Sequence, residues 1–151
     1  MIDRIDQKIL RILQEDGRTT NQALAEACAI SPAACFERVK RLRARGYILA
    51  TRAILDPRML DRSLLIFVEV SLDRTTPDVF ENFSAAVQRN DEIMECHMVA
   101  GGFDYLIKAR LKDMEAYRAF LGNVLVDLPG VRETRTYITL EEVKSSTAIP
   151  I

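Results

Sequence analysis

The sequence predicts an α+β protein built from two units, an N-terminal helix-turn-helix and a C-terminal ferredoxin-like βαββαβ sandwich. Three short amphipathic helical patterns fill residues 1–46, and strand patterns alternating with helical ones fill residues 61–151. A strand-like linker over residues 47–60 joins them. Residues 1–60 carry 11 basic and 7 acidic side chains, although the whole chain has a net charge of −1. This asymmetry indicates two units with different partners.

Each helical pattern of the first unit begins with a residue suited to capping a helix: Asp3, Thr20 or Ser31. Pro32 then occupies the first position of the third helix, and Gly46 follows its last turn. Three short helices with a tight turn between the second and third form a helix-turn-helix.

Positive charge is concentrated on the third helix, where "SPAACFERVKRLRARG" holds five basic residues and one acid, Glu37. We expect Arg38 and Arg41 on its outer face, within reach of phosphates or guanine edges. Ala33 and Ala34 leave room for a close approach to bases. A solvated basic face on an ordinary helical hairpin is the alternative. The capped start, the short turn and the basic helix together favour double-stranded DNA as the partner.

The second unit reads as one antiparallel sheet covered by two helices. The expected elements are a strand at 64–72, a helix from Thr76-Pro77, two strands joined by a tight Gly101-Gly102 turn, a helix from Asp113 and a last strand at 131–143. The helix from Asp113 is expected to turn Met114 and Leu121 inward. Leu65 and Phe67 fall on the sheet face that no helix covers, so an apolar open face and a symmetric dimer are predicted.

Composition argues against several classes of protein. The three cysteines are widely spaced without a CxxC pair, and His97 is the only histidine, so we expect no metal site and no cofactor. The chain has no apolar run long enough for a membrane span and no signal-peptide pattern, which favours the cytoplasm. It has no Gly-rich phosphate loop and no GxSxG. We therefore expect a protein that is not an enzyme.

Several segments resemble the Lrp/AsnC family of bacterial transcription regulators, most closely its leucine-responsive branch. They are "IDRIDQKIL", "SPAACFERVKRLRARGYI", "IFVEV", "ECHMVAGGFDYLIKAR" and "LPGVRETRTYITLEEVK", in order along nearly the whole chain. The resemblance implies a winged N-terminal unit that binds DNA, with its helix-turn-helix at 21–40. It also implies an ACT-like second unit that dimerises, often assembles into octamers, and binds a small amino acid that shifts assembly or DNA affinity. The DNA-binding candidates are Thr20, Asn21, Gln22, Ser31, Ala33, Ala34, Glu37, Arg38, Lys40, Arg41 and Arg45.

The resemblance also implies an effector site at the turn of the central hairpin and on the last strand. The matching residues are Met98, Gly101, Gly102, Phe103, Asp104, Tyr105, Tyr137, Ile138 and Thr139. A glycine turn can offer N–H groups to the carboxylate of an amino acid, and Asp104 can pair with its ammonium. The alternative is a plain hairpin turn with an acid that caps it. Leucine or another apolar amino acid is the expected effector.

This sequence departs from the family pattern at two functional positions. Gly102 stands where close relatives often carry Asp, which leaves the identity of the effector open. Ala29 stands where the turn commonly has Gly, and a left-handed conformation there would cost Ala about 1 kcal/mol. Two other readings remain: an architectural, DNA-compacting protein of the same fold, and an enzyme like the sirohaem decarboxylases. The intact basic helix argues against the enzyme.

Overall fold

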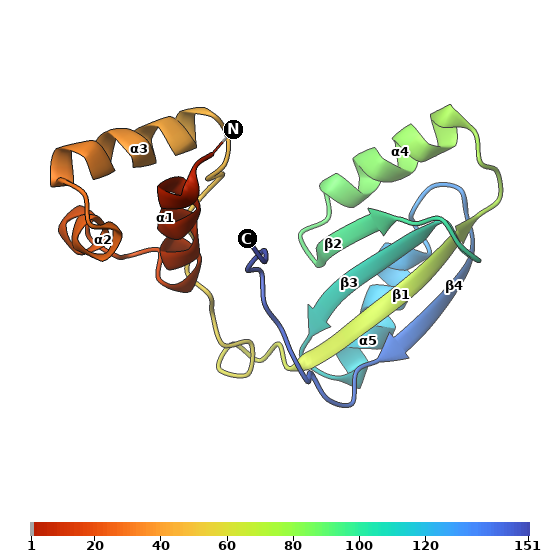
Figure 1. Ribbon diagram of the computed structural model, residues 1–151. Helices are drawn as coiled ribbons and strands as arrows, with labels where there is room; N and C mark the ends of the chain where they lie inside the picture. The colour runs from red at the N-terminus through yellow and green to blue at the C-terminus, as the bar shows by residue number, and fades with distance from the viewer. Residues whose placement is uncertain (1) are drawn as a thin grey trace. The chain divides into compact units, whose positions relative to one another are not determined.

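A computed structural model describes residues 2–151 and divides the chain into two compact units. One comprises Met1–Ile54 with Lys144–Ile151, and the other Leu55–Val143. No helix of the described residues is both long and apolar enough to cross a bilayer. The first unit is helical, and the second combines a β-sheet with helices (Figure 1).

The first unit holds α1 (Arg4–Glu15), α2 (Asn21–Cys28) and α3 (Pro32–Ala44). All three predicted caps are confirmed. Asp3 forms a reciprocal capping box with Asp6, while Thr20 and Ser31 accept hydrogen bonds from the first turns of their helices. Their buried apolar side chains form one small core of Ile9, Leu10, Leu24, Ala25, Cys28, Cys35 and Leu42.

The turn between α2 and α3 is held by backbone conformation and by one side chain. Ala29 adopts φ 54° and ψ 44°. This is the left-handed conformation that we expected to be unfavourable for alanine at this position. Ile30 N donates to Ala25 O at 3.1 Å, which closes the end of α2. Asn21 Nδ2 donates to Pro32 O at 2.8 Å, so the starts of α2 and α3 are tied together.

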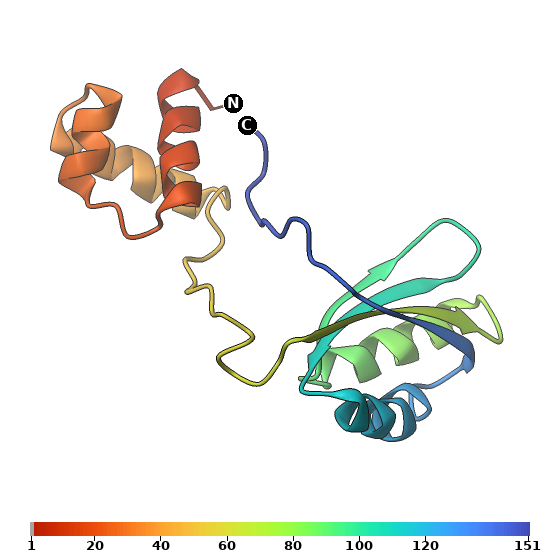
Figure 2. The ribbon, with the colours of Figure 1, turned by 90° about the horizontal axis from the view of Figure 1, so that it is seen from below.

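The second unit is a four-stranded antiparallel sheet in the order β2-β3-β1-β4. Its elements are β1 (Leu64–Leu72), α4 (Pro77–Gln88), β2 (Ile93–Met98), β3 (Tyr105–Leu111), α5 (Met114–Phe120), the π-helical turn η1 (Leu121–Leu125) and β4 (Val131–Ile138). Both long helices lie on one side of the sheet, as Figure 2 shows, and bury Phe83 and Phe120 against Ile66, Val68 and Ile107. The predicted βαββαβ sandwich is confirmed.

Three details of this unit were predicted wrongly. The turn between β2 and β3 is a six-residue loop over 99–104, closed by Val99 N donating to Asp104 O at 3.0 Å. The last strand ends at Ile138 rather than at residue 143. The helix from Asp113 changes at Leu121 into the π-helical turn, whose wider winding buries Leu125. Met114, at the start of α5, is half exposed instead of facing inward.

The open face of the sheet is less apolar than the sequence suggested. Leu65 is only 4% exposed within the chain itself. Polar pairs occupy much of this face, with Lys108 Nζ 2.8 Å from Glu95 Oε1 and Tyr137 OH donating to Glu69 Oε1 at 3.0 Å. Leu65 and Phe67 do lie on the face away from the helices, as predicted, but the face as a whole is mixed rather than apolar.

Exposed apolar side chains gather instead in the segment that precedes β1. Leu49 is 92% exposed and Ile54 is 90% exposed, and Leu55, Met59 and Leu60 are also open to solvent. Residues 48–56 form no strand, so the strand-like linker of the sequence analysis has no ladder partner. Its backbone therefore has no strand partner, and its apolar side chains are exposed to solvent.

Candidate functional sites

The arginines expected on the outer face of α3 are engaged by α1. Arg38 NH1 lies 2.8 Å from Asp6 Oδ1 and 2.7 Å from Asp3 Oδ2, and Arg41 NH2 lies 3.0 Å from Asp6 Oδ2. The Asp6 side chain is 3% exposed, whereas Arg38 and Arg41 keep 24% and 44% of theirs exposed. The expectation that both guanidinium groups are free is therefore corrected: they serve as counter-ions of a buried carboxylate.

The remaining DNA-binding candidates fall into two groups. Thr20 and Ser31 cap their helices, Asn21 binds the start of α3, and Gln22 Nε2 donates to Glu26 at 2.8 Å, so these side chains shape the motif. The others lie exposed on α3 or at its end: Ala33, Ala34, Glu37, Lys40 and Arg45.

Sequence reasoning missed Phe36, which is 57% exposed on α3. The signal was present, because the buried Cys35 and Leu42 and the partly buried Val39 define an apolar stripe that leaves Phe36 to one side. Phe36 therefore lies exposed among the basic side chains of α3.

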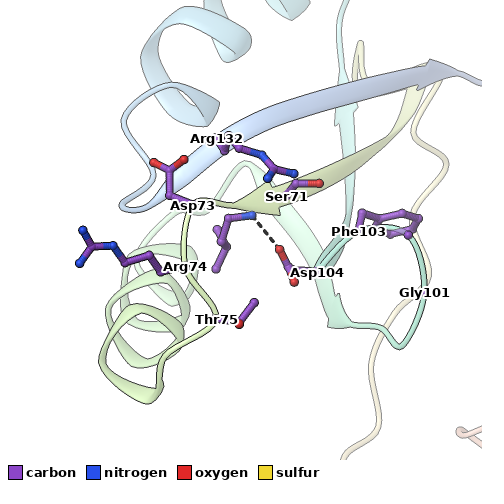
Figure 3. Close-up of a pocket in the computed structure, with 10 residues that line it drawn as sticks. Ser71, Asp73, Arg74, Thr75, Gly101, Phe103, Asp104 and Arg132 are labelled. Atoms are coloured by element: carbon purple, nitrogen blue, oxygen red, sulfur yellow. Dashed lines mark hydrogen bonds between the residues drawn. The ribbon is translucent and has the colours of Figure 1, made fainter.

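A cavity of about 330 Å³ lies at one end of the sheet, where the loop between β2 and β3 meets the end of β1 and the start of β4 (Figure 3). It is lined by Ser71, Leu72, Asp73, Arg74, Thr75, Gly101, Gly102, Phe103, Asp104 and Arg132. Four of the nine expected effector residues are among them: Gly101, Gly102, Phe103 and Asp104.

Asp104 ties the loop to the neighbouring strand. Its Oδ2 accepts a hydrogen bond from Leu72 N at 2.7 Å, drawn as a dashed line in Figure 3, and its backbone N donates to Val70 O at 3.0 Å. The contact falls where the β1–β4 register shifts between Ser71 and Leu72, so the carboxylate satisfies an N–H next to an irregular ladder. Asp104 is therefore a structural anchor, and its other carboxylate oxygen still has acceptor capacity.

Two arginines, Arg74 and Arg132, are among the residues that line the cavity. Arg132 lines it together with a smaller neighbouring cavity of about 110 Å³. Within residues 2–151, Arg132 makes no ion pair, and Figure 3 places its guanidinium beside Ser71, while Arg74 extends away from Asp104. A carboxylate and an unpaired guanidinium at one cavity are complementary to a zwitterion.

The two glycines of the loop leave open space at the cavity. Neither Gly101 nor Gly102 has a positive φ, and a Cβ added to either would meet nothing within 4 Å. The fold of the chain itself therefore does not require glycine at these positions. Their small size leaves room for something outside the chain to approach the backbone.

The other expected effector residues lie outside the cavity. Tyr105 points into the core and stacks on Phe83 at a centroid distance of 4.3 Å, because residues 105, 107 and 109 share the helix-covered face. Tyr137 lies on the open face, and Thr139 N donates to Leu65 O at 2.9 Å. Met98 and Ile138 end their strands half exposed.

Sequence reasoning missed residues 71–75 and Arg132. The predicted topology contained the signal, because β1 runs antiparallel to both β3 and β4. The end of β1 must then lie beside the starts of its two neighbours, which brings these residues to the loop over 99–104.

Two family models match separate parts of the chain. The model described as Winged helix-turn-helix DNA-binding matches residues 2–48, and the Lrp/AsnC ligand binding domain matches residues 65–149. The chain is 54% identical over 150 residues to a leucine-responsive regulatory protein of Salmonella typhimurium, covering 99% of this chain and 92% of that protein. The corresponding Escherichia coli K12 protein is 53% identical with the same coverage.

Solved structures agree over the whole chain. A transcriptional regulator from Neisseria meningitidis in complex with L-Met superposes with a TM-score of 0.94 at 36% identity, covering 99% of this chain and 97% of that one. An AsnC family transcriptional regulator from Agrobacterium tumefaciens gives the same TM-score and coverage at 30% identity.

Proposed function

The chain belongs to the Lrp/AsnC family as a DNA-binding transcription regulator with a ligand-binding domain, and we propose that a small apolar amino acid binds that domain and changes assembly or DNA affinity. Leucine is the favoured effector, because the relatives from Salmonella typhimurium and Escherichia coli are called leucine-responsive. The bound L-Met of the Neisseria meningitidis neighbour belongs to the same chemical class. The cavity lined by both Arg132 and Asp104, with the Asp104 carboxylate anchored to Leu72 N, is the observation that carries the proposal.

In this proposal, the carboxylate and the ammonium of a free amino acid bind to different residues of the cavity. The carboxylate binds the Arg132 guanidinium and the N–H groups of Gly101 and Gly102. The ammonium lies at the Asp104 oxygen that Leu72 N does not use. Because Gly102 contributes no carboxylate, Asp104 and Asp73 are the two acids of the cavity.

Two substitutions at Asp104 separate its anchoring role from its charge. Asp104→Asn keeps an oxygen that can accept from Leu72 N but removes the negative charge, whereas Asp104→Ala removes both. We expect the Asn variant to melt near the parent and to lose about 3 kcal/mol of leucine binding, more than a hundredfold. Its DNA affinity without leucine should be unchanged. Calorimetric titration with leucine beside gel shifts tests this, and an Asn variant that binds leucine like the parent refutes the site.

Arg132 offers an independent test with a matched control. Arg132→Gln should weaken leucine binding because the carboxylate loses its counter-ion, while Arg74→Gln makes the same change in charge on a side chain directed away from Asp104. Equal affinities of the two variants would remove Arg132 from the site.

The DNA-contacting surface that we propose is the exposed part of α3 with its flanking caps. It comprises Ala33, Ala34, Glu37, Lys40 and Arg45, with the free edge of Arg41 available to phosphates. Sharp footprints on selected sites are expected. Uniform coverage of DNA with steep salt dependence would favour an architectural protein instead.

We propose that the protein acts in the cytoplasm as a dimer that assembles further, up to an octamer. The exposed apolar linker supports a second copy as its partner, with two recognition helices about 34 Å apart along DNA or a multiple of that spacing. Sedimentation of Ile54→Asp beside the control Arg52→Asp tests the linker. Ile54 is 90% exposed, so the change should weaken assembly without unfolding the chain.

We also propose that the protein has no enzymatic activity. Its named relatives are regulators of transcription. An absorbance spectrum of the purified protein provides the check, because a bound tetrapyrrole, as a sirohaem decarboxylase would hold, absorbs strongly in the visible range.

A further inference from the structure

The two flanks of α3 differ in what their side chains can do. On one flank, Arg38 and Arg41 are drawn to the carboxylates of α1. On the other, Phe36, Lys40 and Arg43 follow one another at spacings of four and three residues, so they lie along one side of the helix. All three are exposed, and neither Lys40 nor Arg43 forms an ion pair with any residue from 2 to 151.

The free flank combines an apolar group with unpaired positive charge. Phe36 is 57% exposed, and it is not among the residues that pack against the core of its unit. Ala33, one turn earlier on the same side, is small and exposed, so nothing bulky flanks the ring toward the start of the helix. A partner for this flank must present an apolar group to Phe36. It must also present negative charge one to two helical turns further along α3, where Lys40 and Arg43 lie.

The major groove of DNA has this combination. The thymine 5-methyl group is the apolar feature on the floor of the groove, and phosphates line its edges. We propose that Phe36 contacts thymine 5-methyl groups and makes the sequence preference of this protein depend on thymine, while Lys40 and Arg43 bind the adjacent phosphates. This inference rests on α3 being the helix that enters the groove.

A thymine-to-uracil scan tests the contact, because uracil pairs like thymine but lacks the methyl group. The duplex used is one selected by the parent protein from a random pool, with each thymine replaced singly. For the parent we expect about a fourfold loss of affinity at one or two positions, the effect of one buried methyl group. Phe36→Ala should bind the thymine duplex more weakly and lose the discrimination at those same positions. Phe36→Leu should restore part of it.

Lys40→Gln is the matched control on the same flank. It should weaken binding to the thymine and uracil duplexes equally and reduce the salt slope by about one unit. A parent that selects and binds a duplex but treats uracil like thymine at every position overturns the inference while leaving DNA binding intact. A Phe36→Ala variant that still discriminates, or one that sediments as a smaller assembly than the parent, also overturns it. A parent that selects no duplex refutes DNA binding itself.

Discussion

Replacing Asp6 should destabilise the first unit more than any other single change of charge in it. The carboxylate is 3% exposed and accepts from both Arg38 and Arg41 at 2.8–3.2 Å. Asp6→Asn keeps the shape of the side chain and removes its charge, so two guanidinium groups lose their shared counter-ion.

The magnitude follows from how far those groups can return to water. Breaking a fully buried pair costs about 3–5 kcal/mol, most of it from the charge left unpaired. Here Arg38 keeps Asp3 as a partner, and the side chains of Arg38 and Arg41 are already 24% and 44% exposed, so we expect about 2–3 kcal/mol. For a unit of this size that corresponds to a fall in Tm of about 10–20 °C.

Hydrogen exchange read by mass spectrometry can follow the two units separately. Amides of α1 and α3 should exchange faster in Asp6→Asn, while those of β1 and β3 should not change. Asp3→Asn is the control, because the Asp3 carboxylate is 53% exposed and an ion pair in contact with solvent contributes little to stability. If Asp6→Asn protects α1 and α3 as well as the parent does, the ion pairs are not structural, and Arg38 and Arg41 return to the DNA-contacting surface as free side chains.

Three further predictions concern the rest of the chain. Gly102→Ala should leave stability in calorimetry unchanged or raise it by about 0.4–1 kcal/mol, and it should weaken leucine binding. Gly130→Ala should instead destabilise the protein, because the φ of Gly130 is +75° and the added Cβ would lie 2.8 Å from Val79 Cγ1. Burial raises the pKa of the Cys96 thiol from 9.0 to about 11, so iodoacetamide at pH 8 should modify it about a hundredfold more slowly in the native protein than in the unfolded chain. The hydrogen bond from Asp6 N and the Arg38 guanidinium hold the pKa of the Asp3 carboxyl below its ordinary 3.8. These two contacts therefore stabilise the fold fully above pH 3.8, and their contribution is lost as the pH falls through the lowered pKa of Asp3. Thermal melts at acidic pH should show this loss.

Features set by neighbouring residues along the chain were predictable from the sequence. Ser31 and Pro32 define the start of α3 by local hydrogen bonding and backbone geometry, and the structure has the helix at that position. The alternation of 64–72 correctly indicated which residues of β1 face the core. These signals need no knowledge of the rest of the fold.

Contacts between distant segments were not predictable in the same way. A helical pattern indicates that Arg38 lies off the apolar stripe of α3, but it does not reveal the carboxylate that α1 brings to it from 32 residues earlier. Asp104 similarly read as a free acid because its partner, Leu72 N, belongs to a strand 32 residues away. Each misjudged charge had a partner supplied by the tertiary structure.

The contacts of α3 also define the smallest segment that could be moved into another protein to transfer its DNA recognition. A graft of residues 20–46 would carry Asn21 with its bond to Pro32, and so would keep the turn. It would leave behind Asp3 and Asp6, and Arg38 and Arg41 would arrive in the host as uncompensated cations with new rotamers. A chimaera that inherits this protein's operator choice must therefore take α1 with the motif, and hybrids joined between α1 and α2 should fold poorly or bind DNA without discrimination.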